Sequence, residues 1–175
     1  MEDFTGIIER HQRMVFRTLS RLTGSADVED LAQEVFLRLF RALPGFRNEA
    51  SVSTFLYRIM VNVVRDDWRR LESVRRTVSI DAEPVLRESL AGPPEDPSAR
   101  LDQSGLLAML DRCLRELDNE ERAALTLFHQ EGLSYEQVAA ALDLPMGTVK
   151  TRLHRGRARL REMLIERMTP CRTIR

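Results

Sequence analysis

The sequence predicts an all-α fold of two small helical domains joined by a flexible linker. Apolar residues recur at helical spacing through residues 4–70, and the same spacing returns near residue 101 and persists toward the end. Residues 71–100 lose this pattern and contain four prolines, which interrupt helices. We therefore predict domains at 1–70 and 101–175, with a linker at 71–100.

Three helices are expected in the first domain. A first amphipathic helix of about five turns stops at Gly24. A second begins at Asp27, whose carboxylate can cap the first turn, and ends at Pro44–Gly45. After a loop at 46–51, a third helix runs from about Ser53 to Arg70 and completes one small core.

The predicted linker is acidic, with six acidic residues against four arginines. As a relaxed coil its 30 residues would span ~30 Å, and fully extended they would reach ~100 Å. Such a segment can hold two domains far apart.

Local capping signals organise the second domain. Asp118 and Glu121 are placed as a helix cap and its reciprocal partner, and Ser134 and Gln137 repeat that arrangement. After a turn at 143–144, Pro145 opens the last helix. These signals predict two short helices separated by a tight turn.

The charge is distributed unevenly although the formal net charge is zero. Residues 145–175 hold nine basic and two acidic side chains, whereas residues 101–144 hold three basic and nine acidic ones. A basic helix after a capped two-helix motif is how helix-turn-helix proteins present a positive surface to DNA. The alternative is a solvated charged face, but this charge is of one sign and lacks acidic partners four residues away.

The third helix carries a second candidate surface, in which cations and aromatic rings occupy adjacent stripes. One stripe consists of Arg58, Asn62, Arg65 and Arg69, and the other of Tyr57, Val61, Val64 and Trp68. Arginines on phosphates and aromatic faces on unstacked bases would hold a single strand. Alternatively, Tyr57 and Trp68 belong to the core while Asp66 and Asp67 pair with the arginines. The spacing alone leaves both interpretations open.

The sequence gives no support for catalysis, a metal or a cofactor. GxSxG, GxxxxGK[ST], GxGxxG and HExxH motifs are all missing, and the three histidines are far apart. Cys113 and Cys171 form no CxxC pair, so both are expected to remain thiols, with no role assigned. The start of the chain lacks a leader pattern and no apolar run reaches ~20 residues, so we expect a cytoplasmic protein without membrane insertion.

Several motifs, in this order along the chain, resemble the extracytoplasmic-function (ECF) sigma factors of bacterial RNA polymerase, in the sigma-70 family. They are DLAQEVF at 30–36, FR at 46–47, TFLYRIMVNVVRD at 54–66, GLSYEQVA at 132–139 and GTVKTRL at 147–153. The resemblance covers nearly the whole chain outside the linker. It implies a sigma region 2 that docks on the polymerase and recognises and melts the −10 element, and a sigma region 4 that recognises the −35 element.

The resemblance also implies which residues act. Those aligned with the polymerase-docking segment are Asp30, Gln33, Glu34, Phe36, Arg38 and Arg41. Those implied at the −10 element, where a non-template base is flipped into a pocket, are Phe46, Arg47, Asn48, Ser51, Thr54, Phe55, Arg58, Asn62 and Arg65. Those implied at the −35 element are Pro145, Gly147, Thr148, Lys150, Thr151, His154 and Arg155.

The implied partners are core RNA polymerase, through its largest and second-largest subunits, promoter DNA, and an anti-sigma factor that no residue identifies. The family commonly has Trp at the position of Phe55 and Ala at that of Met60, and its residue at the position of His154 is often aromatic or otherwise variable. The promoter sequence, regulon and inducing signal therefore stay open. The alternatives are a stand-alone helix-turn-helix regulator, a decoy that titrates an anti-sigma factor and, with least support, an enzyme.

Overall fold

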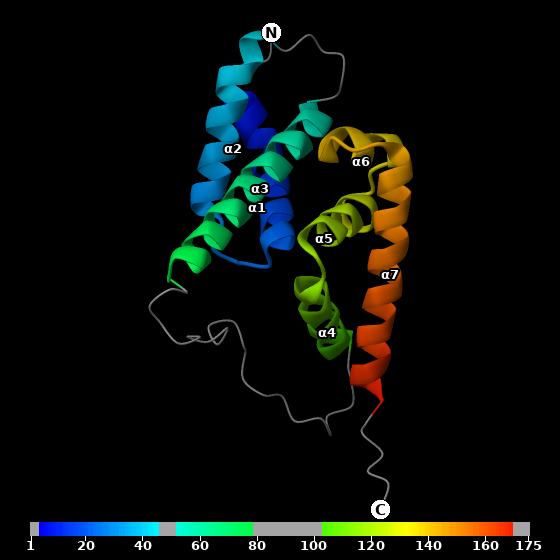
Figure 1. The fold of residues 1–175 in the computed structure, drawn as a ribbon. Helices are drawn as coiled ribbons and strands as arrows, with labels where there is room; N and C mark the ends of the chain where they lie inside the picture. The colour runs from blue at the N-terminus through cyan, green and yellow to red at the C-terminus, as the bar shows by residue number, and fades with distance from the viewer. Residues whose placement is uncertain (1–3, 46–51, 79–102, 170–175) are drawn as a thin grey trace, which may run out of the picture.

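The computed structural model describes residues 4–45, 52–78 and 103–169, and every regular element in these ranges is helical (Figure 1). The first ones are α1 (Phe4–Thr23), α2 (Glu29–Ala42), a short 3₁₀ turn η1 (Leu43–Gly45) and α3 (Val52–Val78). The later ones are α4 (Gln103–Glu116), α5 (Asn119–Leu125), a π-helical turn η2 (Thr126–Gln130), α6 (Tyr135–Leu142) and α7 (Met146–Met168). The predicted all-α fold is confirmed.

Helices α1, α2 and α3 form what we call the N-terminal unit. Each buries one apolar stripe, and fully buried side chains such as Leu19, Leu39 and Met60 meet in its centre. As predicted, α1 ends beside Gly24, whose φ of 73° suits a residue without a Cβ, and α2 ends at the Leu43–Gly45 turn.

The start of α2 differs from the expectation. Helix α2 begins at Glu29, its N-cap is Val28, and no side chain caps it, so Asp27 does not have the predicted role. Instead, the Asp27 N–H donates to Ser25 Oγ at 3.1 Å. The reason is that Val28 is buried in the core, which fixes the point at which the chain turns into the helix.

Helix α3 is longer than predicted, since it continues eight residues beyond Arg70 into the expected linker. Proline and glycine are both missing between Arg70 and Pro84, so no residue there breaks the helix. Leu71 and Val74 are 46% and 54% exposed, which explains why this part of α3 has no periodic apolar pattern. Residues 79–100 of the predicted linker lie outside the described residues.

Helices α4 to α7 form what we call the C-terminal unit, in which α5 packs against α7. The predicted capping box is present: Ser134 Oγ accepts from the Gln137 N–H at 3.2 Å, and Gln137 Oε1 accepts from the Ser134 N–H at 2.8 Å. Asp118 caps α5 by accepting from the Glu120 N–H, so Glu121 is not its reciprocal partner. The turn between α6 and α7 contains Asp143 at φ 53°, a left-handed conformation that aspartate tolerates.

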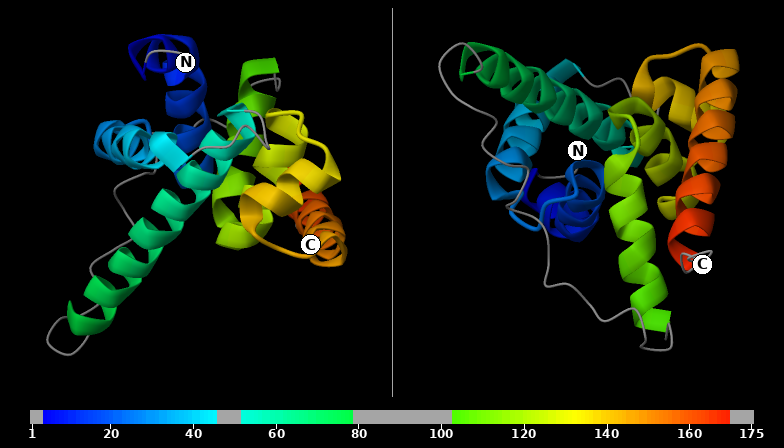
Figure 2. Two further views of the ribbon diagram at one scale, coloured as in Figure 1. Left: turned by 90° about the horizontal axis from the view of Figure 1, so that it is seen from above. Right: turned by 60° about the horizontal axis from the view of Figure 1, so that its bottom comes forward.

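The two units are in direct contact. Helix α6 packs on α3, α5 and η2 pack on α1, and buried residues of both units belong to one continuous apolar core. Figures 1 and 2 show α5 and α6 lying between α3 and α7. The sequence predicted two domains that a linker could hold apart, and the structure instead shows them closed on each other.

Candidate nucleic-acid and polymerase interfaces

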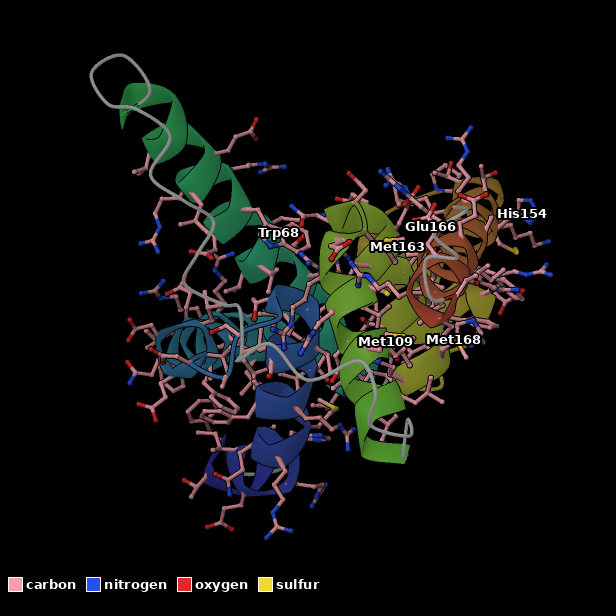
Figure 3. All side chains as sticks on the ribbon, turned by 90° about the horizontal axis from the view of Figure 1, so that it is seen from below. Trp68, Met109, His154, Met163, Glu166 and Met168 are labelled. Atoms are coloured by element: carbon pink, nitrogen blue, oxygen red, sulfur yellow. The ribbon has the colours of Figure 1, made fainter. Side chains whose placement is uncertain are left out.

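The basic surface of α7 is the first candidate interface. Val149 and Leu153 are buried and orient the helix, which leaves the opposite side exposed. That exposed side includes Lys150, Thr151, His154, Arg155, Arg157 and Arg161, while Arg159 is exposed at the edge of the helix beside α5. Figure 3 shows His154 on the side of α7 that faces away from α3.

The first turns of α7 carry the predicted −35 residues. Pro145 is the N-cap, Gly147 is exposed and Thr148 is half-buried. Thr151 Oγ1 donates back to the Gly147 carbonyl at 3.0 Å, which fixes its rotamer. Lys150 Nζ lies 5.8 Å from the centroid of the Tyr135 ring on α6. The seven predicted residues, which are close in sequence, lie at the start of α7, and Lys150, Thr151, His154 and Arg155 share its exposed side.

The rear of α7 is tied to α5 by charge and close packing. Arg152 approaches Glu120 at 3.7 Å, and Arg159 approaches Glu121 at 3.7 Å. Gly156 is buried where the helices cross: a Cβ placed there would lie 2.9 Å from Leu125 Cδ1. These contacts hold the exposed side of α7 in a fixed orientation, as a helix that reads a groove requires.

The polar stripe of α3 is only partly accessible. Arg58, Asn62 and Arg69 are exposed, as expected for residues that contact a strand. Arg65 is not: its Nε and Nη2 donate to the two carboxylate oxygens of Glu120 at 2.8 and 2.7 Å, and its Nη1 donates to the Leu142 carbonyl at 2.9 Å. Arg65 therefore bridges α3 to α5 and α6 in this arrangement.

The aromatic stripe of α3 is covered by the C-terminal unit. Tyr57 is 7% exposed, and its hydroxyl donates to Glu131 Oε2 at 3.1 Å. Trp68 is half-buried with the Arg122 guanidinium 5.5 Å from its ring centroid, and Figure 3 shows it on the side of α3 nearest that unit. The alternative that placed these rings in the core therefore describes this closed arrangement.

Of the arginines in the stripe, Arg69 makes an ion pair of the kind that the alternative placed on α3, whereas Arg38 of α2 and Arg70 lie outside the stripe. Asp66 approaches Arg38 at 2.9 Å and Arg69 at 3.5 Å, and Asp67 approaches Arg70 at 2.9 Å.

Glu131 is a functional candidate that sequence reasoning missed. Its side chain is fully buried, and its carboxylate accepts from Arg21 Nη1 at 2.7 Å, Arg17 Nη2 at 2.9 Å and the Tyr57 hydroxyl. Burial alone raises the pKa of Glu131, but the hydrogen bonds from Arg17 and Arg21 outweigh it and hold the pKa below its ordinary value of 4.5. Burial first, and then the Glu131 charge, raises the pKa of Tyr57 to about 12.

A signal for this contact existed in the sequence. Residues 101–144 carry nine acidic side chains against three basic ones, and Glu120 and Glu131 are among them. That excess contrasts with the basic helix, and it also provides a complementary surface for Arg17 and Arg21 of α1 and Arg65 of α3.

The segment predicted to dock on polymerase forms the outer side of α2. Asp30, Gln33 and Arg41 are exposed, while Phe36 is half-buried against the core. Arg38 donates to Glu34 at 2.7 Å and to Asp66 at 2.9 Å, and the Glu34 hydrogen bond is the main cause that raises its pKa.

Two large apolar residues that we did not predict lie on the same helix. Leu37 and Phe40 are 49% and 57% exposed, and the Phe40 ring meets Phe4 edge-to-face at 5.0 Å. Exposed apolar side chains beside charged ones are typical of a protein-binding surface.

The rest of the predicted −10 site is only partly described. Thr54 and Phe55 are half-buried in the first turn of α3. Phe46, Arg47, Asn48 and Ser51 lie outside the described residues, so their placement stays a prediction.

Among residues 4–45, 52–78 and 103–169, no three His, Cys, Asp or Glu side chains gather in a way that could hold a metal ion. In the same ranges, no helix combines the length and apolar character needed to cross a membrane.

Comparisons with known proteins agree with these two units. Residues 7–74 match the model of Sigma-70 region 2, and residues 107–160 match that of Sigma-70, region 4. The chain is 36% identical over 167 residues to the ECF RNA polymerase sigma factor SigE of Mycolicibacterium smegmatis, covering 94% of this chain and 62% of that relative. It is 33% identical over 159 residues to the ECF RNA polymerase sigma-E factor of Escherichia coli, covering 88% of this chain and 82% of that one. This chain thus spans less than two thirds of the length of SigE.

Solved structures show the same fold. The sigma factor RpoE from Bartonella quintana, crystallised with the anti-sigma factor NepR, superimposes with a TM-score of 0.71 at 26% identity, covering 94% of this chain and 98% of RpoE. CnrH, in complex with the cytosolic domain of CnrY, gives a TM-score of 0.64 at 24% identity over 93% of this chain and 88% of CnrH. The motifs, the two matched regions and these relatives place the chain in the family of ECF RNA polymerase sigma factors.

Proposed function

We propose that this protein is a promoter-specificity subunit, which binds core RNA polymerase and directs initiation by contacting the −10 and −35 elements. The observation that carries the proposal is the α6–turn–α7 motif, with Lys150, Thr151, His154 and Arg155 exposed on one side of a firmly held helix. Arginine and lysine at that position can donate to guanine edges, while the arginines further along α7 are placed for phosphates.

The N-terminal unit would supply polymerase docking and contact with the −10 element. The outer side of α2 would dock on the largest polymerase subunit, and Arg58 and Asn62 of α3, with the loop at 46–51, would hold the melted −10 strand. We propose region limits of 1–70, 71–100 and 101–175; the family matches at 7–74 and 107–160 support two regions in this order, and α3 continues from the first region to Val78. The protein would act in the bacterial cytoplasm by binding rather than by catalysis.

Coupling the two contacts explains why polymerase is needed. One helix on a few phosphates gives weak, salt-sensitive binding, on the order of 10⁻⁴–10⁻⁶ M without specificity. Mounting both units on polymerase makes the second contact intramolecular, which raises avidity by about 10²–10⁴. An anti-sigma factor would prevent that coupling by occupying the same surfaces. The complex of RpoE with NepR supports such a partner, although this chain does not identify it.

The test is run-off transcription from a promoter library with purified core polymerase and the full chain. Lys150→Ala with Arg155→Ala should abolish −35-dependent transcripts and leave co-purification with core polymerase unchanged. Arg13→Ala with Arg112→Ala removes the same charge from exposed positions on α1 and α4 and should leave transcription intact. Unchanged promoter use by the first variant would overturn the −35 assignment.

The same assay separates the alternatives. A stand-alone regulator would bind promoter DNA by itself and direct no initiation with core polymerase. A decoy would bind an anti-sigma factor without needing the basic side of α7.

A further inference from the structure

The C-terminal unit covers one particular face of the N-terminal unit, which we call the covered face. It consists of Arg17, Arg21, Tyr57, Arg65 and Trp68. Three guanidinium groups and two aromatic rings on one face are the combination with which proteins bind single-stranded nucleic acid, the cations contacting phosphates and the rings contacting bases. Arg65, Tyr57 and Trp68 belong to the stripes of α3 considered above for strand binding, whereas Arg17 and Arg21 of α1 are new.

The two carboxylates that occupy the covered face resemble the phosphates of such a ligand, whereas Trp68 is contacted by the Arg122 guanidinium. Glu120 receives a bidentate pair of hydrogen bonds from Arg65, which is how a guanidinium also grips a phosphate. Glu131 accepts from two arginines and a tyrosine hydroxyl, with its side chain withdrawn from water. Two carboxylates therefore pair with the three arginines of the covered face and offset two of their three positive charges.

The contact is suited to reversible opening. A buried carboxylate must be fully paired to be tolerated, and Glu131 is. On opening, the Glu131 carboxylate would be hydrated again, while Arg17 and Arg21 are 54% and 37% exposed already, so the Coulomb energy lost is largely replaced by solvation of Glu131. A polyanion that offers phosphates to the same arginines would displace the carboxylates, whereas a neutral ligand would not.

We propose that the C-terminal unit acts as an internal competitor for single-stranded nucleic acid: Glu120 and Glu131 occupy the covered face until the two units separate, and Arg17 and Arg21 then bind the strand together with Arg65. This inference rests on the proposed function for the role of α3, and it adds α1 to the strand-binding surface. In the closed arrangement the exposed side of α7 stays accessible, so only single-strand binding is withheld.

The experiment uses the full chain and a fluorescein-labelled single-stranded DNA oligonucleotide of mixed sequence. Glu120→Gln with Glu131→Gln keeps the side-chain shapes but removes both charges, and should raise affinity by about tenfold or more, because apparent affinity scales with the fraction of open molecules. Glu162→Gln with Glu166→Gln makes the same charge change at exposed positions on α7. This control measures how much strand affinity rises from the loss of negative charge alone, without opening of the two units.

Opening has its own readout. Trp68 is the single tryptophan of the chain, and it lies at the contact between the units. In the Glu120/Glu131 variant its emission should shift to longer wavelength and its quenching by acrylamide should increase, while helical content by circular dichroism stays constant. Unchanged emission and unchanged affinity would overturn the proposal.

The role of α1 is tested in the opened background. Adding Arg17→Ala and Arg21→Ala to the Glu120/Glu131 variant should remove most of the gain in strand affinity. Retention of the full gain would show that α1 does not bind the strand and would overturn that part. Run-off transcription by the wild-type chain separates a failure of this inference from a failure of the proposed function. If the wild type initiates transcription but the Glu120/Glu131 variant gains no strand affinity, this inference alone is refuted. If the wild type does not initiate transcription, the proposed function is refuted.

Discussion

Gly156→Ala is expected to destabilise the protein although alanine is the better helix former. Exchanging glycine for alanine inside a helix stabilises by about 1 kcal/mol through backbone entropy. At Gly156, however, the new methyl group would lie 2.9 Å from Leu125 Cδ1 and 3.4 Å from Glu121 Cβ, inside the ~3.5–4.0 Å at which carbon atoms attract. Because Leu125 is 3% exposed, it has little room to move, and overpacking of this kind costs ~1–3 kcal/mol.

The expected net effect is a loss of about 1 kcal/mol, or about 2–4 °C in melting temperature for a chain of this size. Gly147→Ala is the matched control, because the same change in the same helix meets nothing within 4 Å. It should be neutral or stabilising by up to ~1 kcal/mol. Thermal and urea unfolding of the two variants beside the wild type provide the measurement. A Gly156→Ala protein as stable as Gly147→Ala would refute the view that close packing at Gly156 sets the distance between α5 and α7.

Three further outcomes are expected. Ser134→Ala removes the side-chain cap of α6 and should cost about 1 kcal/mol in urea unfolding, and an unchanged midpoint would show that the cap is dispensable. The lowered pKa of Glu131 means that its charge stabilises the closed arrangement above the ordinary value of 4.5, and that this contribution is lost as pH falls through the lowered pKa. Trp68 emission should therefore change below about pH 4.5 in the wild type, and a Glu131→Gln variant with the same acid transition would contradict this. Tyr57 should titrate near pH 12. Glu131→Gln should lower the pKa of Tyr57 but leave it above its ordinary value of 10.0, because burial is the larger cause of the shift. Alkaline difference absorbance provides the measurement.

The elements that sequence reasoning placed correctly carry strong local signals. The ends of α1 and α2, the box at Ser134 and Gln137 and the Pro145 start of α7 depend on residues within a few positions of each other. The errors arose where the deciding contact is distant or where no signal exists. The start of α2 is set by the burial of Val28 in the core rather than by a capping side chain. Helix α3 continues beyond the residues that pack in the core.

The candidate sites divide in the same way. The exposed side of α7 was predictable, because a buried Val149 and Leu153 dictate which residues face outward. The state of Tyr57 and Arg65 was not, because it depends on Glu131 and Glu120, which lie 74 and 55 residues away in sequence. Periodicity describes one helix at a time and carries no information on such pairs.

The outward orientation of α7 has a consequence for how such a protein encounters the genome. Under the proposed function, a closed molecule would still offer its basic helix to intact duplexes and would sample grooves by weak electrostatic contact as it diffuses. By the proposed competition, other single strands in the cell would meet a face already occupied by Glu120 and Glu131. Binding of single strands would then be limited to DNA that polymerase has unwound, after the two units have separated.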